Sequence, residues 1–241
     1  MKKIFSLIVV LFLIDSISAQ HKTLTLYYPN DSTNVISISN IDSMSIFICG
    51  ASKVKYGGKD YNTVLIGDQC WLKENLDVGT MINSTIHSTN DSIIEKYCYD
   101  NLPANCDTYG GLYQWNEAMQ YVQTEGAQGI CPEGWHIPTE VEFNDLYSAV
   151  GGDGNAIKAI GQGSGSGAGT NTSGFSALLG GNKETSSSFM HLLMRGHFWS
   201  SSLRVSDSYV YRIYLWDDRP DISPFRSPVA TYGFSVRCIK N

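Results

Sequence analysis

The residues with the clearest chemical potential lie together after a stretch of β-forming residues. Tyr214 and Trp216 end that stretch, and Asp217, Asp218 and Asp221 follow it directly. Aromatic rings of this kind can stack on sugars, and three carboxylates can supply the oxygen ligands that calcium prefers. Aromatic residues at strand spacing are also common core residues, and a polar hairpin turn needs no metal. The sequence predicts a ligand site at these five residues, with calcium as the only candidate cofactor, and an ordinary turn as the alternative.

Patterns typical of enzymes are weaker. The sequence lacks the G-x-S-x-G elbow of serine hydrolases, and its histidines are too far apart to suggest a zinc site. Glu140 and Glu142 would point to different sides of a helix, so they do not form a catalytic pair. We expect His136, between Trp135 and Ile137, to be a packed histidine bonded to the backbone. These observations favour a non-enzymatic protein, with an enzyme acting on polysaccharide as a less favoured alternative.

Six cysteines point to a disulfide framework with fifteen possible connectivities: Cys49, Cys70, Cys98, Cys106, Cys131 and Cys238. Proximity favours the pairs Cys98–Cys106 and Cys49–Cys70. That choice leaves Cys131–Cys238, which would tie the middle of the domain to its last strand. In the loop-entropy model the long bridge stabilises by roughly 4–5 kcal/mol and the short one by roughly 2–3 kcal/mol.

The N-terminus predicts export. Lys2 and Lys3 precede an apolar run from Ile4 to Ile14, and small and polar residues follow as far as Ala19. This is the order of a secretory signal peptide, which we place at residues 1–19; the run is shorter than the ~20 residues of a spanning helix. We therefore expect a periplasmic, cell-surface or secreted protein with no membrane insertion after signal removal.

Composition limits the possible partners. The 241 residues are 42% hydrophobic and only 17% charged, with a formal net charge of −6. No cluster of Lys and Arg suggests nucleic-acid binding, so we expect none. A chain this apolar can build a sizeable core. The sequence leaves the oligomeric state open.

The helix pattern is confined to the middle of the chain. Apolar residues at helical spacing predict one helix from Leu112 to about Gln123. A second is predicted after Thr139, where Glu142 completes a capping box and Gly151-Gly152 provides the stop. Phe143, Leu146, Tyr147 and Val150 would form its buried stripe.

Strand patterns occupy both ends of the chain. Residues 20–48 alternate polar and apolar types and predict a small β meander. The main domain, residues 49–241, should contain a hairpin around Gly57-Gly58, a strand over 209–216 and a closing strand that buries Phe234, Val236 and Cys238. We expect the glycine-rich stretch 161–169 to be a mobile surface loop. The fold class predicted from these elements is α+β with two helices.

Several blocks between about residues 54 and 240 resemble the Fibrobacter succinogenes major paralogous domain family of exported Bacteroidetes and Fibrobacteres proteins. The blocks are 61–76 (YNTVLIGDQCWLKENL), 97–101 (YCYDN), 109–115 (YGGLYQW), 131–140 (CPEGWHIPTE), 173–178 (SGFSAL), 198–201 (FWSS) and 232–238 (YGFSVRC).

The resemblance implies a compact domain related to C-type-lectin-like folds and, more distantly, to formylglycine-generating domains. It implies no particular activity. We expect a non-enzymatic binding module that presents loops to a glycan or a surface protein, with the 204–231 excursion and the 80–95 loop as the contact regions. The alternative from another class is a structural or adhesive surface component.

Overall fold

The chain forms two units, Met1–Phe47 and Ile48–Asn241. The computed structural model describes residues 23–27, 33–37, 47–204, 206, 208–228 and 232–241. In the first unit β1 (Thr23–Tyr27) pairs antiparallel with β2 (Thr33–Ser37). The predicted signal peptide and most of the third strand predicted for this unit, which starts at Met44, lie outside the described residues.

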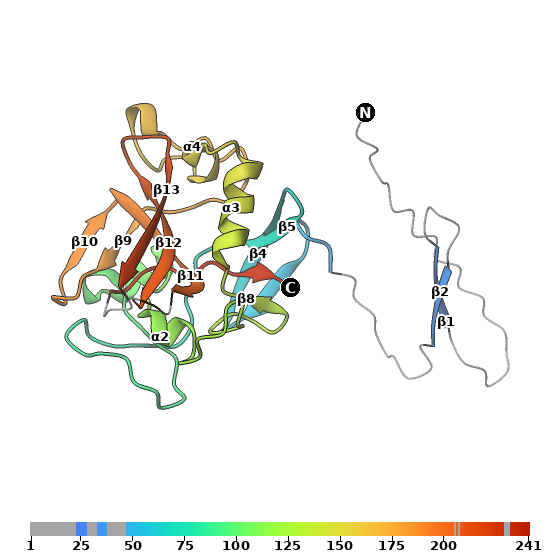
Figure 1. The fold of residues 1–241 in the computed structure, drawn as a ribbon, viewed down its shortest axis with the longest axis horizontal. Coiled ribbons are helices and arrows are strands. Elements are labelled where there is room, and N and C mark those ends of the chain that lie inside the picture. The colour runs from blue at the N-terminus through green and yellow to red at the C-terminus, as the bar shows by residue number, and fades with distance from the viewer. Residues whose placement is uncertain (1–22, 28–32, 38–46, 205, 207, 229–231) are drawn as a thin grey trace. The chain divides into compact units, whose positions relative to one another are not determined.

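Two five-stranded sheets build the second unit, and Figure 1 shows helix α3 between them. The first sheet has the order β10 (Phe189–Leu192), β9 (Gly180–Lys183), β11 (Arg195–Arg204), β12 (Tyr209–Trp216), β13 (Ile222–Pro228). The second has the order β3 (Lys53–Tyr56), β4 (Lys59–Ile66), β5 (Gln69–Leu72), β14 (Ile239–Lys240), β8 (Trp135–His136). Two short strands, β6 (Thr80–Met81) and β7 (Glu95–Lys96), pair in parallel elsewhere.

The α+β class is confirmed, but the described residues contain four α-helices rather than the predicted two. They are α1 (Pro103–Tyr109), α2 (Trp115–Ala118), α3 (Glu140–Ala149) and α4 (Gly154–Ile157). The α1 helix starts at a proline, which suits a first helical position. The Asp153 side chain caps α4 by accepting a hydrogen bond from the Asn155 amide. Such short helices lack the periodic stripe that reveals a longer one.

The capped helix is confirmed in detail. Thr139 caps α3, and its hydroxyl and the Glu142 carboxylate form the reciprocal bonds of a capping box. Phe143 and Leu146 are buried as predicted, whereas the Tyr147 side chain is 46% exposed.

The helix predicted from Leu112 to about Gln123 is wrong over most of its length, because only α2 is helical. Leu112 forms a bridge with Tyr97 instead. Gln120 and Tyr121 have positive φ angles of 49° and 60°, which end the helix. Tertiary pairing therefore overrides a helical spacing of apolar residues here.

The strand predictions agree more closely with the structure. The turn at Gly57-Gly58 joins β3 to β4, and β12 covers the predicted 209–216. Phe234, Val236 and Cys238 are buried as expected. The closing segment is less regular than predicted, because only Ile239–Lys240 is a strand and residues 233–235 make single bridges.

Buried tryptophans from the family-like blocks connect distant segments. The Trp115 indole donates a hydrogen bond to the Ser200 carbonyl at 2.8 Å. The Trp199 indole donates to the Tyr113 carbonyl, also at 2.8 Å. Each bond joins residues that are more than eighty positions apart in the chain, so these blocks specify the core.

Arg237 is fully buried at the centre of this core. Its guanidinium donates to the side-chain oxygen of Asn75 at 2.7 Å and to the carbonyls of Leu72 and Phe175 at 3.1 and 2.5 Å. Burial lowers the pKa of Arg237 to about 9. The Phe175 ring lies 4.4 Å from the guanidinium carbon. One cation thus joins three separate blocks of the sequence.

The disulfides are Cys49–Cys70 and Cys98–Cys106, the two pairs that proximity favours, and Cys131–Cys238, the pair that this choice leaves. Three disulfides point to an oxidising compartment. Within the described part of the chain, no helix has the length and apolar character needed to cross a membrane.

Candidate binding face

One face of β11 and β12 carries a row of aromatic and basic side chains. Arg195 is opposite Trp216 and His197 is opposite Tyr214 in the antiparallel pairing, so the four lie on one face. The Tyr214 ring lies 5.5 Å from the His197 ring and 5.2 Å from the Trp216 ring. Alternate residues of β12 belong to the core instead: Tyr211, Ile213 and Leu215. A packed sheet therefore holds the row in place.

We call this row, together with two further arginines, the aromatic–arginine face. It comprises Arg195, His197, Arg212, Tyr214, Trp216 and Arg219. Its exposure decreases along the row, because Arg219 is exposed, Arg195, Arg212, Tyr214 and Trp216 are half-buried, and His197 is buried.

His197 and Arg212 form the buried end of the face. An Arg212 Nη lies 2.6 Å from His197 Nδ1, and because arginine only donates, this nitrogen must accept. Burial lowers the pKa of His197 well below its usual range, and the Arg212 charge lowers it further. Burial also lowers the pKa of Arg212 to about 10. The histidine is therefore neutral at pH 7, and its ring stacks on Phe234 at 4.8 Å.

Trp216 forms the more open end of the face, between two guanidinium groups. The guanidinium carbons of Arg195 and Arg219 lie 4.2 and 4.3 Å from the centre of its ring. Both distances are within the range of cation–π attraction. Arg219 also contacts the Asp218 carboxylate at 3.4 Å. The predicted aromatic site therefore contains cationic groups in contact with its aromatic ring.

Lys158 fixes the turn that follows Trp216. Its side chain is fully buried, and its ammonium donates to the carbonyls of Gly167, Trp216 and Arg219, at 2.8 Å for Trp216 and 3.0 Å for Arg219. Burial lowers the pKa of Lys158. The ammonium therefore gathers three carbonyl oxygens from two loops and holds the turn against the body of the domain.

The glycine-rich stretch 161–169 is one of those loops. It lies at the surface as predicted, with five of its nine residues exposed, and it is bonded to the turn that follows Trp216. The Ser164 amide donates to the Asp217 carbonyl at 2.7 Å, and the Ser166 hydroxyl donates to the Asp218 carbonyl at 2.8 Å. A Cβ at Gly167 would come within 2.2 Å of the Asp217 carbonyl oxygen. Glycine allows this close backbone approach, so the composition reflects packing around Lys158.

The three predicted acidic residues lie along the same turn. Asp217 is half-buried, and Asp218 and Asp221 are exposed. The backbone of Asp221 forms an isolated antiparallel β-bridge with that of Asp153. Among the residues that the structure describes, no three His, Cys, Asp or Glu side chains form a group that could hold a metal ion. The structure thus brings Tyr214 and Trp216 together, but does not gather the three carboxylates into a metal-ligating group.

The 80–95 loop, the other predicted contact region, is attached through Gln114 and Tyr97. The Ser88 amide donates to the Gln114 side-chain oxygen at 3.0 Å, and the Tyr97 hydroxyl donates to the Ile86 carbonyl at 2.7 Å. Ile86 and Ile93 are about half exposed. The loop offers apolar side chains but none of the stacked rings of the first face.

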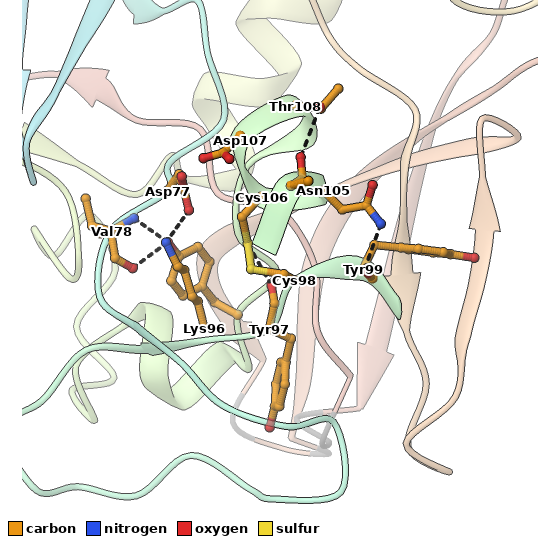
Figure 2. The surroundings of a disulfide bond; sticks show 12 residues. Asp77, Val78, Lys96, Tyr97, Cys98, Tyr99, Asn105, Cys106, Asp107 and Thr108 are labelled. Carbon is orange, nitrogen blue, oxygen red and sulfur yellow. Dashed lines mark hydrogen bonds and ion pairs between the residues drawn. A yellow bond between two sulfur atoms is a disulfide. The ribbon is translucent and has the colours of Figure 1, made fainter. Parts of the chain in front are cut away.

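A cavity of about 240 Å³, lined mainly by polar and charged residues, lies beside the Cys98–Cys106 disulfide. Asp77, which lines it, forms ion pairs with Lys59 and Lys96. Figure 2 shows the Lys96 ammonium directed at the Asp77 carboxylate. Two cations therefore balance the charge of this buried carboxylate. The ion pairs account for the burial of Asp77 by a structural role.

His136 has side-chain partners rather than the backbone partner predicted for it. Its ring nitrogens lie 2.6 Å from the Asn241 side-chain oxygen and 2.9 Å from the Glu142 carboxylate. Burial opposes the charged form of His136, but these hydrogen bonds outweigh it and raise its pKa. Burial likewise opposes the charged form of Glu142, yet its bonds to His136 and Thr139 lower its pKa. The pair is an extension of the capping box.

The sequence did not identify four members of the face, Arg195, His197, Arg212 and Arg219, or the Lys158 side chain that holds the neighbouring turn. Arg212 shares the period-two alternation of Tyr214 and Trp216, and that signal was sufficient to include it. Lys158 is a lone cation in the apolar run Ala-Ile-Lys-Ala-Ile, which signals a buried charge. The positions of Arg195 and Arg219 depend on strand pairing and on the turn.

Comparison with known proteins gives one family. The model of the Fibrobacter succinogenes major domain matches residues 64–240. No curated protein and no solved structure matches the chain. The match includes every described residue of the aromatic–arginine face and Arg237.

Proposed function

The chain belongs to the Fibrobacter succinogenes major domain family, and we propose that it is an exported, non-enzymatic binding module whose aromatic–arginine face takes a glycan. The observation that carries this proposal is the half-exposed row of Tyr214 and Trp216 on a sheet whose other side is core. Stacked aromatic rings on a fixed scaffold can bind ligands with little loss of conformational entropy.

The hydrogen bonds from the Lys158 ammonium to the carbonyls of Gly167, Trp216 and Arg219, which we call the Lys158 clamp, support the proposal. They fix the conformation of the turn beside Trp216 in the absence of a ligand. Loops that carry binding residues are usually mobile, whereas this turn is held by an internal cation and by the loop at 161–169. A C-type-lectin-like scaffold and a location in the periplasm, at the cell surface or outside the cell are part of the proposal.

A non-enzymatic role is consistent with the use of the buried carboxylates. Asp77 is paired with two lysines. Glu117 accepts hydrogen bonds from the Glu95 amide at 3.1 Å and from the Tyr121 hydroxyl at 2.9 Å. Burial raises the pKa of Glu117, and its bonds attach the 80–95 loop to α2.

A second candidate function, self-assembly at the cell surface, is favoured by one observation. Met190, Leu193 and Met194 are each about half exposed near the start of β11, and the Asp217 amide donates to the Met194 carbonyl at 2.9 Å. Apolar side chains beside the face could pack on a neighbouring copy. Light scattering over a range of protein concentrations tests this: growth of the particles with concentration supports it, and a constant monomer contradicts it.

The test of glycan binding is a glycan array probed with the oxidised full-length protein, with calcium and again with a chelator. We expect binding that survives the chelator, because arginines rather than a metal-ligating group surround Trp216. Calcium-dependent binding would assign the acidic turn instead. A blank array from folded protein would contradict the proposal.

A further inference from the structure

Arg195 differs from Arg212, Arg219 and Arg237, because its side chain makes no hydrogen bond or ion pair with another described residue. Arg212 contacts His197, Arg219 contacts Asp218, and Arg237 contacts Asn75. The Arg195 Nε is buried without a hydrogen-bond partner. Leaving a buried donor unpaired destabilises a fold, so an unpaired arginine on the aromatic–arginine face requires an explanation.

The guanidinium of Arg195 is held in place without a carboxylate. It stacks on the Trp216 ring at 4.2 Å, and the two residues are directly opposite each other in the β11–β12 pairing. Unlike Nε, its two terminal nitrogens are not buried atoms without a partner, and no hydrogen bond joins them to a described residue. A flat guanidinium with free terminal donors is the group that binds a carboxylate through two parallel hydrogen bonds.

The surroundings of Arg195 are basic. Its charge contributes to the lowered pKa values of His191, His197 and Arg212, after burial as the main cause. Glu184 is the one described acidic residue whose charge acts on both His191 and Arg212. The charged groups of the face are the guanidinium groups of Arg195, Arg212 and Arg219, of which Arg219 is paired with Asp218. Such a group of cations attracts anions.

From these observations we propose that Arg195, stacked on Trp216, binds an oxyanion of an acidic polysaccharide, a carboxylate or a sulfate. The inference rests on the proposed glycan-binding function and names the class of glycan. Guanidinium groups already lie against the Trp216 ring. An acidic sugar therefore pairs with Arg195 at the edge of this stack and need not displace either arginine from the ring.

Polygalacturonate and its fully methyl-esterified form test the proposal, because the two polymers share a backbone and differ in charge. We expect the oxidised full-length protein to bind the acid form and to bind the ester much more weakly. Dextran sulfate and dextran form the second pair of probes, and Arg195-dependent binding of dextran sulfate alone would identify the oxyanion as sulfate.

Three variants locate the interaction. Arg195→Gln should weaken binding of the acid polymer about tenfold or more, the range expected for a lost hydrogen bond to a charged group. Arg195→Lys keeps the charge without the planar fork and should be intermediate. Arg204→Gln is the matched control: it removes an arginine at the other end of β11, where Arg204 lies 5.9 Å from the Tyr209 ring, and should change affinity less than twofold.

The outcomes separate the two proposals. The role of Arg195 would be overturned, and glycan binding left standing, by either of two results. One is equal binding within both pairs of probes, acid and ester forms as well as dextran sulfate and dextran; the other is equal effects of Arg195→Gln and Arg204→Gln. A folded protein that binds no polymer and gives a blank array would overturn both. A variant that matches the wild-type unfolding temperature excludes misfolding as the cause of lost binding.

Discussion

Arg237 and Lys158 are both fully buried cations whose partners are oxygen atoms of carbonyl or amide groups. Arg237 binds Leu72, Asn75 and Phe175, which come from two separate segments of the core. Lys158 binds Gly167, Trp216 and Arg219, which belong to two loops at the binding face. Both regions therefore use a buried cation bonded to oxygen atoms. They differ in what the cation joins, which is core segments for Arg237 and surface loops for Lys158.

The comparison shows where stability and function are separated. Removing Arg237 leaves acceptors unpaired deep in the core, where water cannot replace the lost donor. The Lys158 partners include Arg219, an exposed residue of a turn, so water can hydrate part of that site. We therefore expect Arg237 to control global unfolding and Lys158 to control local order at the Trp216 turn.

The largest expected effect concerns the disulfide of Cys238, the residue next to Arg237. It tests whether the crosslink contributes more than the cation to the free energy of unfolding. Replacing Cys131 and Cys238 by alanine opens a bridge with a sequence separation of 107, and we expect a loss of about 5 kcal/mol. The matched double variant at Cys98 and Cys106 opens a separation of 8 and should lose about 2.5 kcal/mol. Urea unfolding measures both, and equal losses would contradict the loop-entropy explanation.

Arg237→Leu should have the next largest effect, a loss of about 4 kcal/mol in the free energy of unfolding. The change leaves the Leu72 and Phe175 carbonyls and the Asn75 side-chain oxygen without their donor, and each unpaired buried acceptor costs about 1–3 kcal/mol. Denaturant unfolding with the disulfides intact gives the value. Arg237→Lys, which keeps a charge and loses the fork, should recover only part of it. A loss below about 1 kcal/mol would mean that the network around Arg237 rearranges.

Lys158→Met should cost less, about 2 kcal/mol, and should act locally. Hydrogen exchange should show lost protection at the amides of Ser164 and Asp217, which belong to the two loops that Lys158 joins and donate to the carbonyls of Asp217 and Met194, while amides of β5 and β14 stay protected. Lys183→Met is the matched control, because Lys183 is also fully buried but lies over the Tyr97 ring. If both variants loosen the 216–221 turn equally, the clamp assigned to Lys158 does not exist.

The same contrast explains how far the sequence predicts the structure. The capping box of α3, the hairpin at Gly57-Gly58 and strand β12 depend on neighbours in the chain and could be predicted. Proximity along the chain predicts two of the disulfide pairs, and the third pair consists of the two cysteines that remain. The family-like blocks coincide with the core, because Trp115, Trp199 and Arg237 each donate a hydrogen bond to a residue of another such block.

Features that depend on tertiary pairing could not be predicted. Leu112 has helical spacing from its apolar neighbours, yet it pairs with Tyr97. The glycines of 161–169 have the composition of a linker, yet the Gly167 backbone packs against Asp217. At the candidate site, the sequence identifies Tyr214 and Trp216 but not Arg195, because the two strands that bring Arg195 over the Trp216 ring must first pair in register.

The smallest expected effect concerns His136 and Glu142, a polar pair that belongs neither to the buried core nor to the binding face. The raised pKa of His136 means that its contribution is complete below its ordinary value of 6.5 and is lost as the pH rises through the folded value. The lowered pKa of Glu142 means that its contribution is complete above its ordinary value of 4.5 and is lost as the pH falls through the folded value. Both contributions are therefore present between about pH 4.5 and 6.5.

Glu142→Gln tests this pair while keeping a residue that can complete the capping box. Between pH 6 and 8 we expect the free energy of unfolding of the wild-type protein to fall by less than about 1 kcal/mol, the usual range for a partly exposed pair. The fall should be smaller in the variant over the same interval. Thermal unfolding at several pH values measures the difference. His136→Asn should flatten the curve in the same interval, since it removes the titrating ring. An unchanged pH profile in both variants would show that other groups set the pH dependence and that the pair only caps α3.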